Sequence, residues 1–150
     1  MNCVALSSLL LAVVACGPKP GPGGGAGGSA TGVLPDVPFD EYDHEQKIQF
    51  MKQKVMPTMA PLFQRHDPQR FARFDCKTCH GPIADRGEYH MPNDKLPKLN
   101  LADLRSFDPR NVAFMQNLIK PTMARLLKQP EFSEENTDGF GCMGCHTRVQ

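Results

Sequence analysis

The feature that most constrains the fold of this 150-residue chain is a Cys-x-x-Cys-His motif that occurs twice. The first motif spans residues 76–80 and the second spans residues 142–146. The chain has six cysteines, and the two outside the motifs, Cys3 and Cys16, lie close to the N-terminus. Any fold must therefore bring each pair of thiols together with the histidine that follows it.

The two motifs lie at corresponding places in an internal repeat. Phe50-Met51 and residues 57–62 recur as Phe114-Met115 and residues 121–126, with the same spacing inside each block. The connector from the repeated block to the motif is longer by two residues in the second unit. We interpret residues 39–150 as one domain that contains a duplicated module of helix, turn and Cys-x-x-Cys-His.

Helix signals predict an all-α fold for this domain. Asp108-Pro109 is typical of a helix start, because Asp caps free N–H groups and Pro fits the first turn. Apolar residues then recur at helical spacing, and Asp43 precedes a matching pattern in the first unit. We expect Pro57 and Pro61 to kink or restart the first helix. No alternating apolar run predicts a strand, and residues 81–101 are expected to form a long loop.

A Cys-x-x-Cys-His motif is typical of covalent haem attachment. Two cysteines three residues apart on a helical turn present their sulfurs on one side, where they can form thioethers with one haem. The histidine that follows faces the iron, and its second ring nitrogen is free to be fixed by a backbone carbonyl. We therefore expect two covalently bound haem c groups, held by Cys76, Cys79, His80, Cys142, Cys145 and His146, with the two histidines as proximal iron ligands.

Three other uses of paired cysteines compete with haem attachment: a structural zinc site, a thiol redox pair and a plain disulfide. A zinc ribbon separates its cysteine pairs by about 15–20 residues. Here the stretch between Cys79 and Cys142 is several times as long. Thiol redox chemistry of the thioredoxin kind is expected beside a βαβ pattern, which this sequence lacks. Both comparisons favour haem attachment.

The N-terminal residues predict export and lipidation. Val4 to Ala15 is a mostly apolar run, too short to span a bilayer, that ends in small side chains. We therefore expect a signal peptide over residues 1–15, although no Lys or Arg precedes the run. Residues 13–16, Val-Val-Ala-Cys, resemble the lipobox of bacterial lipoproteins. The resemblance implies that Cys16 becomes the lipidated first residue of the mature chain and anchors it to a membrane.

A linker is predicted between this anchor and the domain. The stretch from Gly17 to Pro38 is rich in Gly and Pro and has no apolar periodicity. Such a composition is typical of a disordered tether. We therefore divide the chain into a signal peptide (1–15), a lipidated Gly/Pro-rich linker (16–38) and a dihaem domain (39–150).

Taken together, the two motifs, the export signal and the lipobox resemble those of multihaem c-type cytochromes of bacterial envelopes. A Met-bearing helix, a turn and then Cys-x-x-Cys-His is similar to the module of the photosynthetic reaction-centre cytochrome subunit, which has four such modules where this chain has two. In that module the distal Met lies on the preceding helix. The resemblance thus implies distal ligands from one of two repeat-matched pairs, Met59 with Met123 or Met51 with Met115.

We prefer Met59 and Met123 as the distal ligands. They are the pair nearer to the first Cys of their motifs, whereas the other pair lies about two helical turns farther away. Because four residues follow His146, the second haem is expected to take its distal ligand from upstream or from a neighbouring chain. Other candidates for the first haem, none of which has a counterpart in the second unit, are His44, His66, His90 and Met91.

Electron transfer is the expected function, because haems with both axial positions filled leave no open site for a substrate. We expect an electron carrier rather than an enzyme, held at the periplasmic face of a bacterial membrane, with the outer membrane favoured, and serving redox-protein donors and acceptors. The alternatives are a dihaem enzyme of the peroxidase type and a gas-binding or sensing cytochrome, each of which needs one open iron.

Composition bears on the partners and on the core. The formal charge is +1 and no basic run is interleaved with aromatic residues, so nucleic acid is not an expected partner. Hydrophobic residues make up 40% of the chain and Trp is absent, which predicts a modest core that haem groups would complete.

Charged residues of opposite sign precede the two motifs, and each group could attract a different redox partner. The basic group before the first motif contains Arg65, Arg70, Arg73 and Lys77, and the acidic group before the second contains Glu131, Glu134, Glu135 and Asp138.

Overall fold

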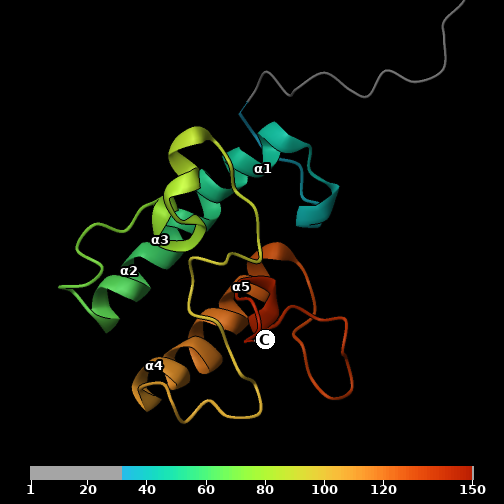
Figure 1. Cartoon of the computed structure of the whole chain (residues 1–150). Helices are drawn as coiled ribbons and strands as arrows, with labels where there is room; N and C mark the ends of the chain where they lie inside the picture. The colour runs from blue at the N-terminus through green and yellow to red at the C-terminus, as the bar shows by residue number, and fades with distance from the viewer. Residues whose placement is uncertain (1–31, 150) are drawn as a thin grey trace, which may run out of the picture.

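The computed structural model describes residues 32–149, which form two long helical rods connected by loops and short turns (Figure 1). Within these residues there is no β-strand and only three isolated β-bridges, so the predicted all-α class is confirmed. No helix of the described part is long and apolar enough to cross a membrane. The expected signal peptide, Cys16 and most of the expected linker lie outside the described residues.

The first rod consists of α1 (His44–Phe50), a π turn (Met51–Val55) and α2 (Met56–His66). Asp43 begins this rod, as predicted. Its carboxylate accepts a hydrogen bond from the Gln46 N–H at 2.8 Å, and the Gln46 side chain accepts one from the Asp43 N–H at 3.0 Å. This reciprocal cap satisfies two N–H groups that a helix start otherwise leaves unpaired.

Proline explains the π turn in the first rod. Pro57 has no N–H to bond to the carbonyl four residues earlier, and its ring would press against that carbonyl in a regular α-helix. The π turn widens the helix at this point, and the Met56 N–H bonds to the Met51 carbonyl, five residues back. The expected kink or restart is therefore a wider turn in a continuous rod, and Pro61 lies inside α2.

The second rod has the same construction over α4 (Pro109–Phe114), a π turn (Met115–Ile119) and α5 (Lys120–Leu127). Asp108 caps it as predicted, with its carboxylate 2.8 Å from the Arg110 N–H. The π turn again precedes a proline, Pro121, and the Lys120 N–H bonds to the Met115 carbonyl. The two π turns begin at Met51 and Met115, which are a matched pair of the sequence repeat.

The rods meet at a small apolar cluster formed by Tyr42, Phe50 and Leu127. The Phe50 side chain is 7% exposed, and its ring centroid lies 5.5 Å from that of Tyr42. Met51 from the first rod and Met123 from the second pack against this cluster. The contact between α5 and the first π turn thus forms the centre of the fold.

Packing on this cluster begins earlier in the chain than the linker prediction placed it. Leu34 and Val37 pack against the cluster, and the Tyr42 hydroxyl donates a 2.6 Å hydrogen bond to the Pro35 carbonyl. A short 3₁₀ turn, Phe39–Glu41, then leads into α1. Residues 34–37 therefore belong to the folded part of the chain.

Aromatic side chains make a second junction between the end of α2 and α4. The His66 ring stacks on Phe114 with centroids 3.9 Å apart and an angle of 5° between the planes. Its Nε2 atom lies 2.7 Å from Oδ1 of Asn111. Phe63 also contacts Phe114, edge to face at 5.1 Å. Two separate junctions therefore fix the relative position of the rods.

Replacement of Phe50 by Ala tests the main junction. We expect the free energy of unfolding to fall by about 3 kcal/mol, because the substitution leaves a cavity beside Tyr42 and Leu127. Leu101→Ala is the control, since that side chain is 41% exposed and its loss should change stability by less than about 0.5 kcal/mol. Denaturant unfolding measures both, and equal effects would contradict this location of the core.

Candidate functional site

The first Cys-x-x-Cys-His motif coincides with a single-turn helix, α3 (Cys76–His80). Asp75 caps this turn: its carboxylate accepts a 2.8 Å hydrogen bond from the Lys77 N–H, and its own N–H donates to the Thr78 hydroxyl at 3.1 Å. The cap lets five residues hold helical geometry without a longer helix around them. Both cysteines and the histidine thus lie on one helical turn, as predicted.

Gly81 ends this helix and turns the chain sharply. Its φ of 71° lies in the region that only glycine enters without strain. A Cβ atom at this position would also lie 3.0 Å from Cγ of Lys95. The small residue therefore lets the later loop approach the back of the motif. A 3₁₀ turn, Pro82–Arg86, follows it inside the loop that was predicted from residue 81.

The second motif has a tighter backbone than the first. Cys142–Gly144 form a 3₁₀ turn, and the His146 N–H bonds to the Cys142 carbonyl at 2.9 Å. Gly144 lies against the Phe140 ring, where a Cβ atom would be 2.9 Å from the nearest ring carbon. The two motifs thus share their sequence but not their local helix type.

The four thiols of the motifs are half-buried and form no disulfide. Burial raises the pKa of Cys79 to about 11, with smaller contributions from Cys76 and Asp75. Burial also raises the pKa of Cys145 to about 12, and the neighbouring Cys79 adds to this effect. Reactive redox thiols have a lowered pKa. These two thiols have the opposite environment and remain protonated at neutral pH.

The environments of the two motif histidines differ, and each favours a neutral ring nitrogen that could coordinate a metal. Nδ1 of His146 lies 2.9 Å from the Pro97 carbonyl, which can only accept a hydrogen bond, so in the neutral form of the ring Nδ1 carries the proton and Nε2 keeps a free electron pair. Burial lowers the pKa of His80, which favours the neutral imidazole that metals bind. Its Nδ1 atom is buried without a hydrogen-bond partner in the described part of the chain.

The structure places the two motifs next to one another through a loop between them. The Asn93 N–H bonds to the Cys145 carbonyl at 2.9 Å, and the Asn93 side-chain amide bonds to the Cys79 carbonyl at 3.3 Å. Farther along, the Leu99 N–H bonds to the Thr147 carbonyl at 2.9 Å. In Figure 1 this yellow loop accompanies the C-terminal segment at the middle of the molecule. Residues 93–99 therefore pair with residues 145–149.

Sequence reasoning missed the part that Asn93 and Pro97 play in this site. The only local signal was the Asn-Asp pair at residues 93–94, which is typical of a turn. The Asn93 side chain does form such a turn, accepting a hydrogen bond from the Lys95 N–H at 2.8 Å. Its contacts with both motifs depend on how the whole chain folds.

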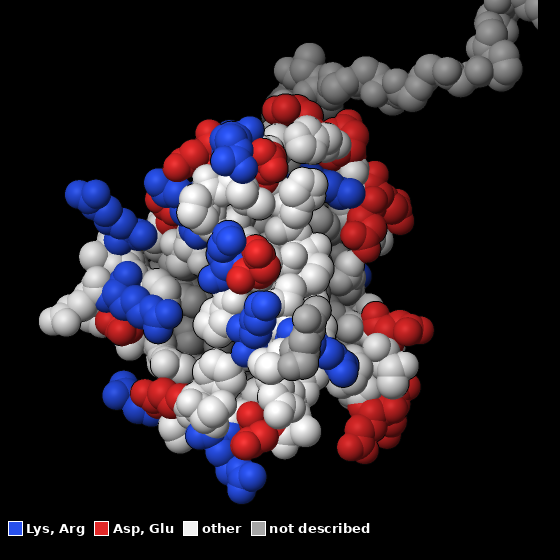
Figure 2. All heavy atoms as spheres, in the orientation of Figure 1, with Lys and Arg blue, Asp and Glu red and all other residues white. Residues whose placement is uncertain are grey.

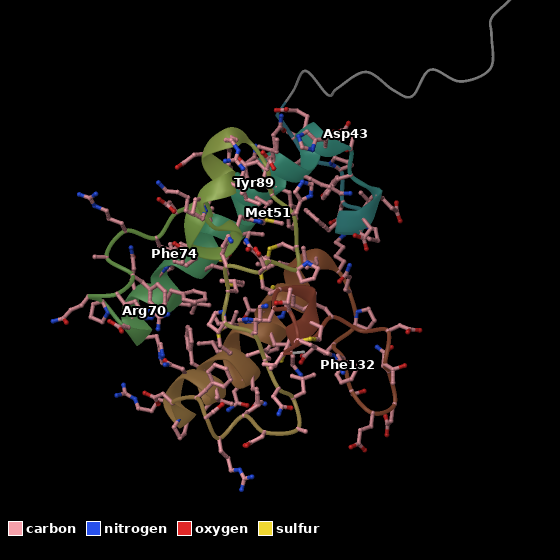
Figure 3. The ribbon with its side chains drawn as sticks, in the orientation of Figure 1. Asp43, Met51, Arg70, Phe74, Tyr89 and Phe132 are labelled. Atoms are coloured by element: carbon pink, nitrogen blue, oxygen red, sulfur yellow. The ribbon has the colours of Figure 1, made fainter. Side chains whose placement is uncertain are left out.

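Methionines of both predicted pairs lie on the rods. Met59 in α2 is 3% exposed, and Met123 in α5 is half-buried against the main apolar cluster. Met51 and Met115 begin the two π turns and are half-buried. Figure 3 shows Met51 near the middle of the molecule. The choice between the pairs stays a prediction.

The other candidate distal ligands for the first haem lie on α1, on α2 and in the loop after the first motif. His44 at the start of α1 and His90 in the loop are both exposed, and Met91 is half-buried in the loop. His66 is stacked on Phe114 and bound to Asn111, so it serves the aromatic junction. Within residues 32–149, no group of three or more His, Cys, Asp or Glu side chains converges as a metal site would require.

Two hollows lie on the surface of the described part of the chain, one beside the first motif and one beside α4. A hollow of about 230 Å³ adjoins the first motif and is lined by residues that include Cys76, Asp85 and Tyr89. The Tyr89 ring lies edge-on to His80, with centroids 5.4 Å apart. A larger hollow of about 380 Å³ lies between α4 and residues 102–107, and neither motif contributes to its lining. The first hollow is therefore the one that belongs to the candidate site.

Basic side chains are more frequent on one side of the molecule and acidic side chains on the other, although both signs occur on each side (Figure 2). Basic atoms project at the left of Figure 2, on the side where Figure 3 labels Arg70, and acidic atoms gather at the lower right, where Figure 3 labels Phe132. No ion pair of the described residues includes Arg65, Arg70 or Arg73. Lys77 is partly compensated by Asp85 at 3.5 Å, and Glu131 by Lys120 at 3.3 Å.

Comparison of the chain with protein-family models, with curated proteins and with solved structures gives no match in any of the three.

Proposed function

We propose that this protein is a dihaem c-type cytochrome, anchored to a membrane of the bacterial envelope through Cys16, that transfers electrons between redox proteins. The observation that carries the proposal is the pair of Cys-x-x-Cys-His motifs, each with two free thiols beside a histidine. In the first motif one helical turn carries all three groups, and in the second Cys145 and His146 directly follow the 3₁₀ turn that contains Cys142.

The residues of the two motifs fit the proposed prosthetic groups. Cys76 and Cys79 would hold one haem and Cys142 and Cys145 the other, through thioether bonds that need reduced thiols. A bound haem supplies a one-electron redox couple at its iron. The Pro97 carbonyl fixes the proton of His146 on Nδ1, which orients Nε2 as the ligand atom. His80 is half-buried, and its Nδ1 atom has no hydrogen-bond partner among the described residues, so this ring lacks the carbonyl contact that orients His146.

The domain is proposed to be a duplication of one haem-binding module. Capping aspartates, π turns and prolines occur in the same order in both rods. The π turns begin at Met51 and Met115, so they fall at matched positions of the sequence repeat. A shared irregularity of this kind supports a common origin better than two ordinary helices would, because π turns are rare.

Met59 and Met123 are the proposed distal ligands. Both follow the π turn of their rod by the same number of residues, and both are shielded from solvent at least in part. A thioether ligand raises the potential of a haem relative to a second imidazole. The proposed carrier therefore has a moderately high potential, and filled axial positions distinguish it from peroxidases and gas sensors.

The opposite charges at the two sides of the molecule support separate docking of a donor and an acceptor. Each charged segment leads directly into one motif, Arg73 into the first and Asp138 into the second. Complementary charges accelerate the encounter of redox proteins and orient them. The proposed path runs from one charged side, through the two adjacent motifs, to the other.

Covalent haem content is the direct test of this proposal. The intact mass should exceed that of the polypeptide from Cys16 by two haems plus lipid. A double substitution, Cys76→Ala with Cys79→Ala, should remove one haem, and the matched pair Cys142→Ala with Cys145→Ala should remove the other. A mass that shows zinc or no haem would refute the proposal.

Anchoring can be tested separately by replacing Cys16 with Ser. The variant should be released from membranes as a soluble protein with an unchanged absorption spectrum, because the lipid and not the domain is the proposed anchor. Membrane fractionation followed by spectroscopy measures both properties. Retention of the Ser variant in the membrane fraction would reveal another anchor.

The distal ligands are tested by Met59→Ala and Met123→Ala, one haem at a time. Each substitution should remove half of the weak far-red band of Met-ligated ferric haem, lower one midpoint potential and open one iron to carbon monoxide. Met51→Ala and Met115→Ala are the matched controls and should leave all three properties unchanged. If the controls abolish the band instead, the outer pair of the repeat supplies the ligands.

A further inference from the structure

Asn93 is a buried polar side chain in a loop that is otherwise largely exposed. It is 3% exposed, and its side-chain oxygen accepts a hydrogen bond from the Lys95 N–H at 2.8 Å. Its side-chain amide donates to the Cys79 carbonyl at 3.3 Å. Its backbone N–H donates to the Cys145 carbonyl at 2.9 Å. A buried amide is stable only when such partners are present.

The two carbonyls that Asn93 binds have equivalent places in the two motifs. Each belongs to the second cysteine, directly before the histidine, so one residue holds the backbone on which both His80 and His146 are mounted. The Cys79 thiol is near enough to contribute to the raised pKa of Cys145. The contacts of Asn93 thus join corresponding points of the two motifs.

The surrounding chain reinforces this connection. Gly81 lets the loop approach closely, because a Cβ atom there would lie 3.5 Å from the Asn93 amide nitrogen and still closer to Lys95. Four residues beyond Asn93, the Pro97 carbonyl binds Nδ1 of His146. The loop that follows the first motif therefore also orients the histidine of the second.

We propose that Asn93 is a positioning residue that locks the two Cys-x-x-Cys-His motifs side by side and so sets the distance and angle between the two haems. This inference rests on the proposed function and adds to it a device for electron exchange within the molecule. Groups outside the first coordination sphere commonly control the geometry of metal sites in this way. Two haems held at a fixed, short separation couple electronically, and the coupling depends on their distance and angle.

Asn93→Asp removes only one part of this connection. The new side chain keeps the shape and the acceptor for Lys95, and the backbone bond to Cys145 is unaffected. Its second oxygen cannot donate to the Cys79 carbonyl and repels it, so the first motif loses its link to the second. Asn93→Ala, which removes the same donor without adding a charge, is the second variant.

The experiment measures covalent haem by intact mass and haem–haem coupling by circular dichroism in the Soret band, on the full-length protein. Wild type should contain two haems and show a bisignate exciton couplet. Both Asn93 variants should retain two haems and lose the couplet. Asn100→Asp is the matched control, because the Asn100 side chain only accepts a bond from the Ala102 N–H in an exposed turn of the same loop. Phe50→Ala is a second control that lowers stability and should keep the couplet.

The possible failures are distinguishable. Wild type without haem would refute the proposed function and this inference with it. Two haems without a couplet in wild type, or an unchanged couplet in both Asn93 variants, would overturn the inference and leave the proposed function standing. Loss of a haem from both variants would also overturn it, because Asn93 would then be needed for attachment and not for spacing.

Discussion

Backbone pairing between residues 93–99 and the C-terminal residues 145–149 is the interaction on which the candidate site depends. It joins the segment after the first motif to the second motif, although the whole second rod lies between them in the chain. The rods alone do not achieve this, because their junctions lie at Tyr42, Phe50 and Leu127 and at the aromatic contacts of His66. The rods form the scaffold of the domain, and the paired segments bring the two Cys-x-x-Cys-His motifs next to each other on it.

Features governed by local chemistry were predictable from the sequence. Asp43 and Asp108 begin the rods because an aspartate can satisfy free N–H groups at a helix start wherever that helix later packs. The helical turn of the first motif and the all-α class follow from equally local patterns. The prolines also gave a signal: we expected Pro57 to kink or restart the helix, and a π turn precedes it, after which α2 begins at Met56 in a continuous rod.

What the sequence did not reveal depends on contacts between distant segments. Asn93 carries an ordinary turn signal, and only the folded chain shows that its amide reaches Cys79 while its N–H reaches Cys145. The contact of the Pro97 carbonyl with His146 could not be predicted from the sequence, because every residue has a backbone carbonyl. Packing of Leu34 and Val37 was missed because a Gly/Pro-rich neighbourhood hides two apolar residues whose partners lie elsewhere. A pattern within one segment cannot specify such partners.

The small hydrophobic core and the burial of the thiols are both compatible with the proposed haem attachment. Seven hydrophobic residues are buried within residues 32–149, a small number for a domain that fixes two rods and two motifs. Burial keeps Cys79 and Cys145 protonated, which is unfavourable for a redox dithiol and for a thiolate metal site. A thioether bond, by contrast, leaves a neutral sulfur that a buried position tolerates. In the proposed function, large apolar macrocycles attached at these sulfurs would supply the packing that the side chains lack, and burial that disfavours free thiol chemistry would be compatible with the neutral thioether.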